Sequence, residues 1–282
     1  MNRQKFKQTI PYLILGMFTL FFCWFFCGRY GVFGSKVDWI SQHSVLPDYF
    51  RQQFYNTGQL FPEFAANIGG GQNIYNFAYY GLYSPVVLIS YFLPFVKMSD
   101  YMMAAGVISL LAAVLLFYKW LLRRGITSRL SFLTALLFLL SGPMIYHSYN
   151  QIMFVNYMPF LCLAFLGVDR YFEKQKPGLY TISVFLMILT SFYFSIGGMF
   201  ALVLYGIYRY AEGKEKLGEN IKILGFVSDG FRFLLPMLTA VLMSAVLLVP
   251  TAMALAGGRE GGHKRALSAL LIPEIPIFRV VY

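Results

Sequence analysis

The chain has 282 residues, of which 58% are hydrophobic and only 12% are charged, and its formal net charge is +11. Soluble domains usually carry roughly 25% charged residues, and the mean hydropathy here is +0.61, so the composition excludes an ordinary soluble domain. The basic residues collect in short connections between apolar segments, which indicates membrane topology and excludes a nucleic-acid surface as the source of the charge.

The first apolar segment covers residues 11–27 and follows a basic N-terminus. It is long and aromatic and has no small-residue cleavage site, so we expect it to remain as a membrane anchor. The three cysteines (Cys23, Cys27 and Cys162) lie inside apolar segments without metal-ligand or redox spacing. Their expected role is packing.

A polar, aromatic-rich stretch from about 29 to 100 predicts a large loop on the outer face of the membrane. Apolar residues recur at helical spacing between 45 and 54, while Asp48, Arg51, Gln52 and Asn56 fall on the other side, so we expect a helix lying apolar side down on the membrane. The apolar piece 84–96 is too short for a span and is interpreted as a re-entrant or interfacial helix.

Six further segments have the composition of membrane spans: 101–121, 130–146, 152–168, 179–193, 196–208 and 233–256. With the first, they predict an all-α integral membrane protein of about seven spans, a single module over 1–282. The distribution of Lys and Arg places the N-terminus in the cytoplasm and the C-terminal tail outside. Segments 179–193 and 196–208 form either a tight hairpin that does not fully cross the membrane or one long bent helix; the basic stretch 214–222 favours the hairpin, because it then lies inside.

Within the outer loop, Asp38 is the strongest candidate for chemistry, because it follows the first span and sits at the membrane face. Capping of a helix, or a salt bridge with Lys36 or Arg51, would be its structural role instead. Asp48 and Glu63 are weaker candidates. The glycine triplet 69–71 allows a sharp turn or a close approach to a ligand, and the polar-aromatic stretch that follows includes Asn73 and Tyr79. Such residues stack on sugar rings, although tyrosines are common at any membrane interface.

Several motifs occur in an order that resembles the bacterial YfhO-type membrane proteins, which look like GT-C glycosyltransferases. These are VDWISQH at 37–43, NIGGGQN at 67–73, YYGLYSP at 79–85, YH at 146–147, MP at 158–159, TSFYF at 190–194 and PT at 250–251. Members of that family are considerably longer, so the resemblance implies that this chain is an N-terminal module. It also implies a GT-C-like bundle with interfacial helices in its first outer loop.

The resemblance further implies inverting transfer of a sugar from a polyprenyl-phosphate-linked donor to an extracytoplasmic cell-wall polymer, such as lipoteichoic acid, at the bacterial plasma membrane. GT-C enzymes place an acidic residue in the first outer loop, and Asp38 matches that position. A carboxylate can serve as the general base that such a transfer needs. Substrate contacts are expected from Gln42, His43, Asn73, Tyr79 and His147.

The lipid phosphate that leaves needs cations. Arg259 is the best placed of these, since arginine binds phosphate with two parallel hydrogen bonds; His263, Lys264 and Arg265 could assist. An ordinary basic loop is the structural alternative for this segment. A divalent metal is possible, but few carboxylates lie close together in the outer loop, which argues against a tightly held all-protein site.

Asn150 and Gln151 join His147 in the short outer turn between the third and fourth predicted spans, where polar groups could line the same cavity as Asp38. Two other functions remain open. One is a flippase or transporter of a lipid-linked precursor, which would need a polar path through the helices. The spans show no ionisable residue at their centres, which argues against an ion-coupled carrier. The other is a non-catalytic assembly subunit.

Overall fold

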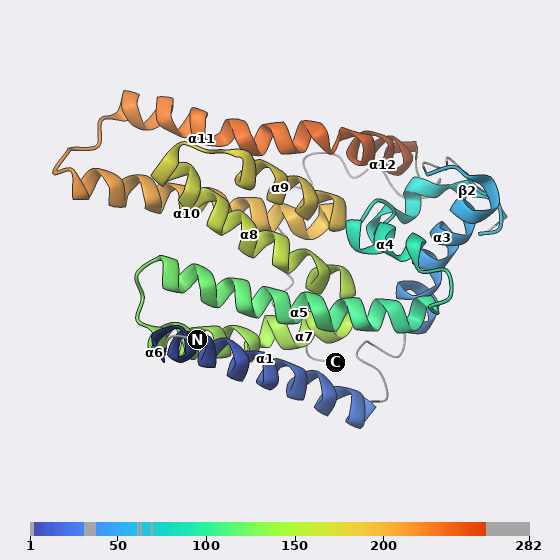
Figure 1. Ribbon diagram of the computed structural model, residues 1–282. Coiled ribbons are helices and arrows are strands. Elements are labelled where there is room, and N and C mark those ends of the chain that lie inside the picture. The colour runs from blue at the N-terminus through green and yellow to red at the C-terminus, as the bar shows by residue number, and fades with distance from the viewer. Residues whose placement is uncertain (1–2, 31–37, 61, 63, 69, 258–282) are drawn as a thin grey trace, which may run out of the picture.

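The computed structural model describes residues 3–30, 38–60, 62, 64–68 and 70–257, and it is all-α apart from one short strand pair, as the composition predicted (Figure 1). The long helices and their continuations are α1 (Arg3–Tyr30), α5 (Met98–Arg123), α6 (Ser128–Leu139), α7 (Gly142–Asn150), α8 (Ile152–Lys174), α9 (Gly178–Thr190), α10 (Phe192–Lys216), α11 (Ile223–Met243) and α12 (Ala245–Gly257).

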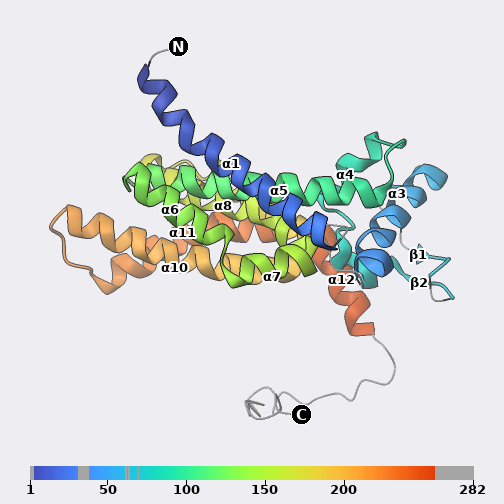
Figure 2. The ribbon, with the colours of Figure 1, turned by 90° about the horizontal axis from the view of Figure 1, so that it is seen from below.

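The predicted outer loop contains small elements gathered at one end of the bundle (Figures 1 and 2). They are the π-helical turn η1 (Trp39–His43), α3 (Val45–Thr57), strands β1 (Phe64–Ala65) and β2 (Gln72–Asn73), the 3-10 helices η2 (Ile74–Tyr80) and η3 (Ser90–Phe92), and α4 (Pro85–Ile89). The two strands pair antiparallel. We call this end of the molecule the loop end and the opposite end, where α5, α8 and α10 finish, the basic end.

Five of the described helices are long and apolar enough to cross a membrane: α1, α5, α8, α10 and α11. The pair α6–α7 makes a sixth if its 47° bend at Ser141 is counted as one span. The predicted span 179–193 corresponds to the 13-residue helix α9, and 84–96 contains only the five-residue α4 and η3, so it is not a span. The prediction of about seven spans therefore exceeds the number of long helices described.

The predicted span 233–256 differs most from the structure, because it falls on two helices. Helix α11 begins ten residues earlier, at Ile223, and ends at Met243; α12 follows after Ser244. The Ser244 hydroxyl donates to the carbonyl of Ala240, four residues back. Serine bonds of this kind bend helices, which the apolar composition of the segment does not reveal.

Helices α9 and α10 form a hairpin, and the alternative of one long bent helix is wrong; unlike the short hairpin predicted, however, its second helix, α10, is long enough to cross a membrane. The chain reverses at Ser191, whose backbone is extended (φ −158°, ψ 98°). The two helices then lie side by side, so that a Cβ added at Gly198 would come 2.9 Å from Met187 Sδ. The C-terminal end of α10 consequently reaches the same end of the bundle as the end of α5 (Figure 1).

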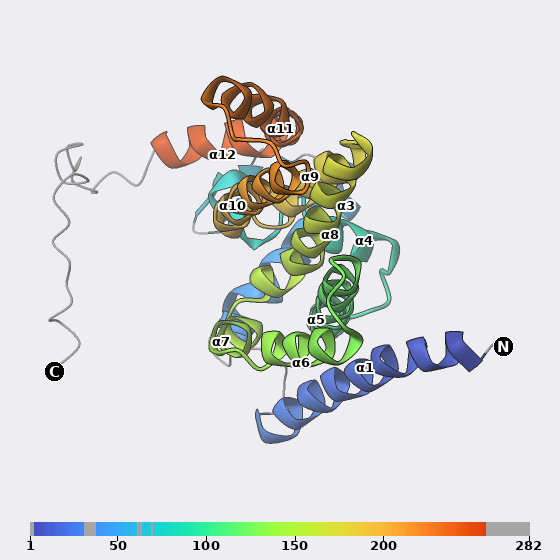
Figure 3. The same ribbon diagram turned by 90° about the vertical axis from the view of Figure 1, so that its left-hand side faces the viewer.

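Seen along the bundle, α1 borders α5 and α6, α8 lies centrally, and α9–α11 form the other side (Figure 3). At the basic end a buried ion network joins α5, α8 and α10. Asp169 is fully buried, lies 3.1 Å from Arg209 Nε, and accepts a 2.6 Å hydrogen bond from the Tyr205 hydroxyl. Glu212 accepts from Arg124 and Arg209 at 2.6 and 2.7 Å. The spacing of these residues along the chain does not predict that their charges meet.

Helix α3 forms as predicted, but its environment differs from the prediction. Leu46 and Phe50 pack against Ala65, Ile74 and other residues of the loop itself, so protein and not membrane covers this apolar face. On the side expected to face solvent, one residue is only 3% exposed: Arg51. The loop therefore has a small core of its own.

The contact between α8 and α9 depends on Gly167. A Cβ at this position would lie 2.6 Å from the Cα and N atoms of Tyr180, which are backbone atoms and cannot rotate away. We therefore expect Gly167→Ala to force the two helices apart and to lower the free energy of unfolding by about 1–3 kcal/mol. Thermal melting of the purified protein in detergent measures this.

Gly197 in α10 is the matched control, because a Cβ there meets nothing within 4 Å. Alanine is a better helix former than glycine by about 0.8–1.0 kcal/mol, so Gly197→Ala should melt at or slightly above the wild-type temperature. Equal melting of the two variants would mean that the close approach of α8 and α9 contributes nothing to stability.

Candidate functional site

Residues from three separate segments converge at the loop end around Asp38. The turn η1 has Asp38 as its N-terminal flanking residue and contains Gln42 and His43. Helix η2 supplies Tyr79 and Tyr80, and the break between α7 and α8 supplies Gln151. We call Asp38, Gln42, His43, Tyr79, Tyr80 and Gln151 the Asp38 cluster.

Two tyrosine–glutamine hydrogen bonds tie the cluster together. The Tyr80 hydroxyl donates to Gln42 Oε1 at 2.5 Å, and the Tyr79 hydroxyl donates to Gln151 Oε1 at 2.7 Å. Among the described residues, neither glutamine side-chain nitrogen has a hydrogen-bond partner. Both amides, which are half-buried, can therefore donate N–H bonds to hydroxyl or phosphate oxygens of a bound molecule.

The charge of Asp38 affects the pKa of several neighbouring side chains in the cluster. Burial first, and then the neighbouring phenols and the Asp38 carboxylate, raise the pKa of Tyr79 to about 12. Burial and Asp38 likewise raise the pKa of Tyr80. Both phenols therefore keep their protons at neutral pH and remain the donors in the bonds to the glutamines. The half-buried carboxylate lies among hydroxyl donors at the loop end.

His43 is buried, 2% exposed, and its ring centroid lies 6.2 Å from that of Tyr80. Burial lowers its pKa below the ordinary value, while the charge of Asp38 acts in the opposite direction and is the smaller influence. At neutral pH His43 is therefore an uncharged imidazole beside a carboxylate. It is placed to exchange hydrogen bonds, not to supply a positive charge.

The lowered pKa of His43 makes stability depend on pH. The unfolded chain binds a proton at His43 near pH 6.5, whereas the folded protein does so only at lower pH. The contribution of His43 to stability is therefore complete above pH 6.5 and is lost as the pH falls through the folded pKa. We expect His43→Gln to flatten the melting temperature of the purified protein between pH 7 and about pH 5; an unchanged profile would contradict a neutral buried His43.

Two of the three structural roles considered for Asp38, the helix cap and the salt bridge with Arg51, are not observed. Its side chain makes no capping hydrogen bond to η1. Arg51, its proposed salt-bridge partner, pairs instead with Asp48 at 2.7 Å. Lys36, the other proposed partner, lies outside the described residues, as does Glu63.

The remaining predicted site residues lie at different distances from the cluster. Phe194 lies between His147 and the cluster. The ring centroid of His147 is 5.8 Å from that of Phe194, and the Phe194 centroid is 6.5 Å from that of Tyr79. The Nδ1 atom of His147 is buried without a hydrogen-bond partner among the described residues. Asn73 is exposed, and its side chain accepts from the Tyr75 N–H and so caps η2. Among the described residues, no hydrogen bond joins the Asn73 side chain to the Asp38 cluster.

The candidate cations Arg259, His263, Lys264 and Arg265 lie outside the described residues. Helix α12, which precedes them, packs against η2 through Leu247, a member of the same small core as Ile74 and Ala78. In the part of the chain that the structure describes, no three His, Cys, Asp or Glu side chains come close enough to hold a metal ion.

Sequence reasoning missed one wall of the site. Tyr193 and Phe194, at the turn of the α9–α10 hairpin, lie 6.0 and 6.5 Å from the Tyr79 ring. Tyr193 is 61% exposed. Ser191 is the N-cap of α10, and its hydroxyl oxygen accepts a hydrogen bond from the Phe194 N–H. A serine at this position is a signal in the sequence that a helix begins, and it could have placed Tyr193 and Phe194 at the turn.

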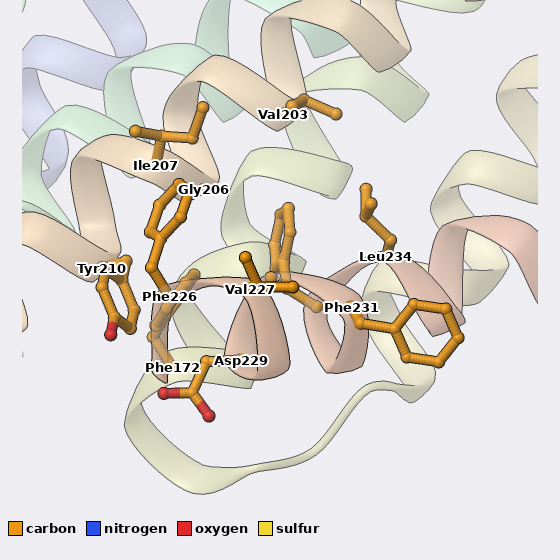
Figure 4. A pocket seen from close by; sticks show the side chains of 12 residues that line it. Phe172, Val203, Gly206, Ile207, Tyr210, Phe226, Val227, Asp229, Phe231 and Leu234 are labelled. Carbon is orange, nitrogen blue, oxygen red and sulfur yellow. The ribbon is translucent and has the colours of Figure 1, made fainter. Parts of the chain in front are cut away.

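A largely apolar pocket of about 350 Å³ lies elsewhere, between α10 and α11 at the basic end (Figure 4). Phe172, Phe226 and Phe233 line it, with Asp229 as the acidic residue of the lining. It opens beside exposed apolar side chains such as Val227 and Phe231, as expected of a recess in a lipid-facing surface. It is at the other end of the bundle from the Asp38 cluster and offers no comparable set of polar groups.

Comparison with known proteins gives one match. A family model described as "Bacterial membrane protein YfhO" matches residues 8–270. No curated protein and no solved structure matches the chain.

Proposed function

The chain belongs to the YfhO family of bacterial membrane proteins, and on this basis we propose that it is a multi-pass membrane glycosyltransferase module. In this proposal it moves a sugar from a polyprenyl-phosphate-linked donor to an extracytoplasmic cell-wall polymer of the lipoteichoic acid type, at the bacterial plasma membrane. The observation that carries the proposal is the convergence of Tyr79, from η2, and Gln151, from the break between α7 and α8, on the turn that bears Asp38 and Gln42.

In the proposed reaction the Asp38 carboxylate accepts the proton of an acceptor hydroxyl as that oxygen attacks the anomeric carbon of the sugar. The new carbon–oxygen bond forms on the face opposite the phosphate, the bond from the anomeric carbon to the phosphate oxygen breaks, and polyprenyl phosphate leaves with the electron pair. The configuration at the anomeric carbon is therefore inverted.

Other groups serve binding in this scheme. The side-chain N–H groups of Gln42 and Gln151 donate to sugar hydroxyls, and Tyr79 with Tyr193 forms an aromatic wall for the ring. Arg259 binds the leaving phosphate, with a divalent cation shared with the substrate as a further source of positive charge. His147, behind Phe194, and Asn73, at the start of η2, support the walls of the site.

The proposal places the loop end outside the cell and the N-terminus in the cytoplasm. The basic end supports this, because Lys and Arg there outnumber those of the loop end: Lys119, Arg123, Arg124, Arg129, Arg170, Lys174, Lys176, Arg209, Lys214, Lys216 and Lys222. Short loops rich in Lys and Arg stay on the cytoplasmic side.

Vesicles that contain the full-length protein test this function and separate it from the flippase alternative. The polyprenyl-phosphate-linked sugar and the acceptor polymer are both supplied at the loop-end side only. A transferase attaches sugar to the polymer under these conditions. Failure of transfer here, together with movement of donor lipid across the bilayer when donor is supplied at the basic-end side, would identify a flippase; failure of both would leave a non-catalytic subunit.

A further inference from the structure

Besides the apolar pocket between α10 and α11, a more polar pocket of about 420 Å³ lies at the loop end, between the start of α3 and the start of α5. Two cationic side chains, Arg51 and Lys97, line it together with the hydroxyl groups of Ser44 and Ser99; Asp48 is the acidic residue of the lining. The lining therefore has a net positive charge. Neither the Asp38 cluster nor the proposed transfer reaction uses these residues.

Next to this pocket, an apolar tip formed by residues 92–96 projects from the molecule. Phe92 is 85% exposed and Phe95 is 99% exposed. Lys97, at the end of the tip, is the N-terminal flanking residue of α5, which is one of the helices able to cross a membrane. The tip therefore lies where a span begins, at the level of the lipid headgroups, and insertion of a phenylalanine into the acyl region is favourable compared with exposure to water.

Hydrogen bonds from Arg51 hold the backbone of the tip in place. One guanidinium nitrogen, Nη1, donates to the carbonyl oxygens of Leu93 and Val96 at 3.3 and 2.9 Å, and the other, Nη2, donates to Asp48 Oδ1 at 2.7 Å. Its Nε is buried without a partner among the described residues. The tip is thus a fixed structure, and Asp48 compensates the charge of the guanidinium at its base.

Lys97 and the first turn of α5 leave positive charge available at the mouth of the pocket. No described acidic side chain lies within 4 Å of the Lys97 amine. The start of α5 has no side-chain cap, so the N–H groups of Met98 and Ser99, both residues of the pocket lining, have no acceptor within the helix. The N-terminus of a helix attracts anions through these groups and its dipole.

We propose that this pocket binds the phosphate of an anionic phospholipid from the leaflet at the loop end. Lys97, Ser99 and the first-turn N–H groups of α5 contact the headgroup, Arg51 holds the backbone of the tip in place, and Phe92 and Phe95 lie between the acyl chains. The tip and the pocket together anchor the loop to a lipid surface of negative charge. This inference is independent of the proposed sugar transfer.

The test uses Phe95→Trp as a fluorescent reporter in the full chain, reconstituted into equal mixtures of phosphatidylcholine and phosphatidylglycerol. Bromine, which quenches tryptophan, is placed on the acyl chains of one lipid or the other. The parent chain, with Trp24, Trp39 and Trp120, provides the background to subtract. We expect quenching by both lipids, with phosphatidylglycerol enriched about fivefold at the tip, equivalent to roughly 1 kcal/mol for one cation at a lipid surface.

Lys97→Gln in the reporter chain should reduce this enrichment to near one while quenching itself persists. Lys119→Gln is the matched control, because Lys119 is an exposed lysine near the other end of the same helix; it should leave the enrichment unchanged. Equal quenching by the two lipids before any lysine is replaced would overturn headgroup recognition. Absence of quenching by either would place the tip in water and overturn the anchor. Loss of the enrichment on addition of inorganic phosphate, but not of sodium chloride at the same ionic strength, would support a pocket that recognises the phosphate group.

Discussion

Asp38→Asn is expected to abolish sugar transfer to the wall polymer, with a loss of about 10²–10⁴-fold. Asparagine has nearly the same shape as aspartate, so the hydrogen bonds of Tyr79 and Tyr80 to Gln151 and Gln42 should persist. It cannot accept a proton from the attacking hydroxyl. The measurement is sugar attached to the polymer per amount of full-length protein in the membrane.

Asp100→Asn is the matched control. Asp100 is an exposed carboxylate at the same end of the molecule, in the first turn of α5, and it has no ion pair with any described residue. Its loss should leave transfer unchanged. Normal transfer by Asp38→Asn at normal protein levels would remove Asp38 as the base, whatever the control shows.

Asp169→Ala should cause the largest loss of stability, about 3–5 kcal/mol, because breaking a buried ion pair leaves charge without compensation. Asp169 is fully buried and lies within 4 Å of both Arg124 and Arg209. Without it, these two guanidinium groups share Glu212 alone. The Tyr205 hydroxyl also loses its acceptor. Thermal melting in detergent, with recovery of monodisperse protein, measures the effect.

The comparison is with Glu173→Gln. Glu173 pairs with Arg123 at 2.6 Å at the same end of the bundle, but both side chains are more than one third exposed. Exposed pairs contribute about 0–1 kcal/mol, so this variant should melt close to the wild type. If the two variants melted alike, the buried network would have no special part in joining α5, α8 and α10.

The sequence was sufficient for features that depend on local composition. Runs of apolar residues predicted α1, α5, α8 and α10, and the basic stretch 214–222 favoured the α9–α10 hairpin correctly. It also placed Asp38, Tyr79 and Gln151 at the same face, because each belongs to the outer loop or an outer turn. What it could not predict was how η1, η2 and the α7–α8 break pack together, and thus which tyrosine meets which glutamine.

The features that escaped prediction all depend on contacts between distant segments. Helical spacing correctly separated Arg51 from the apolar face of α3, but it does not show that the carbonyls of Leu93 and Val96 cover that polar side. Similarly, Arg124 and Arg209 looked like ordinary positive charges at the ends of spans. Their burial follows from the position of Asp169, which lies 40 or more residues away from each of them in the chain.

The length of α9 determines how far below the membrane surface Tyr193 and Phe194, which form one wall of the site, lie. With 13 residues, α9 is about 20 Å long, against about 30 Å for the hydrocarbon core. Lys174 and Lys176 precede it, so its first residue begins near one surface and the turn with Tyr193 and Phe194 stops about 10 Å below the other. In the proposed function, a long-chain isoprenoid carrier would thus keep its tail in the bilayer while its headgroup reaches these aromatic rings, without being lifted into water.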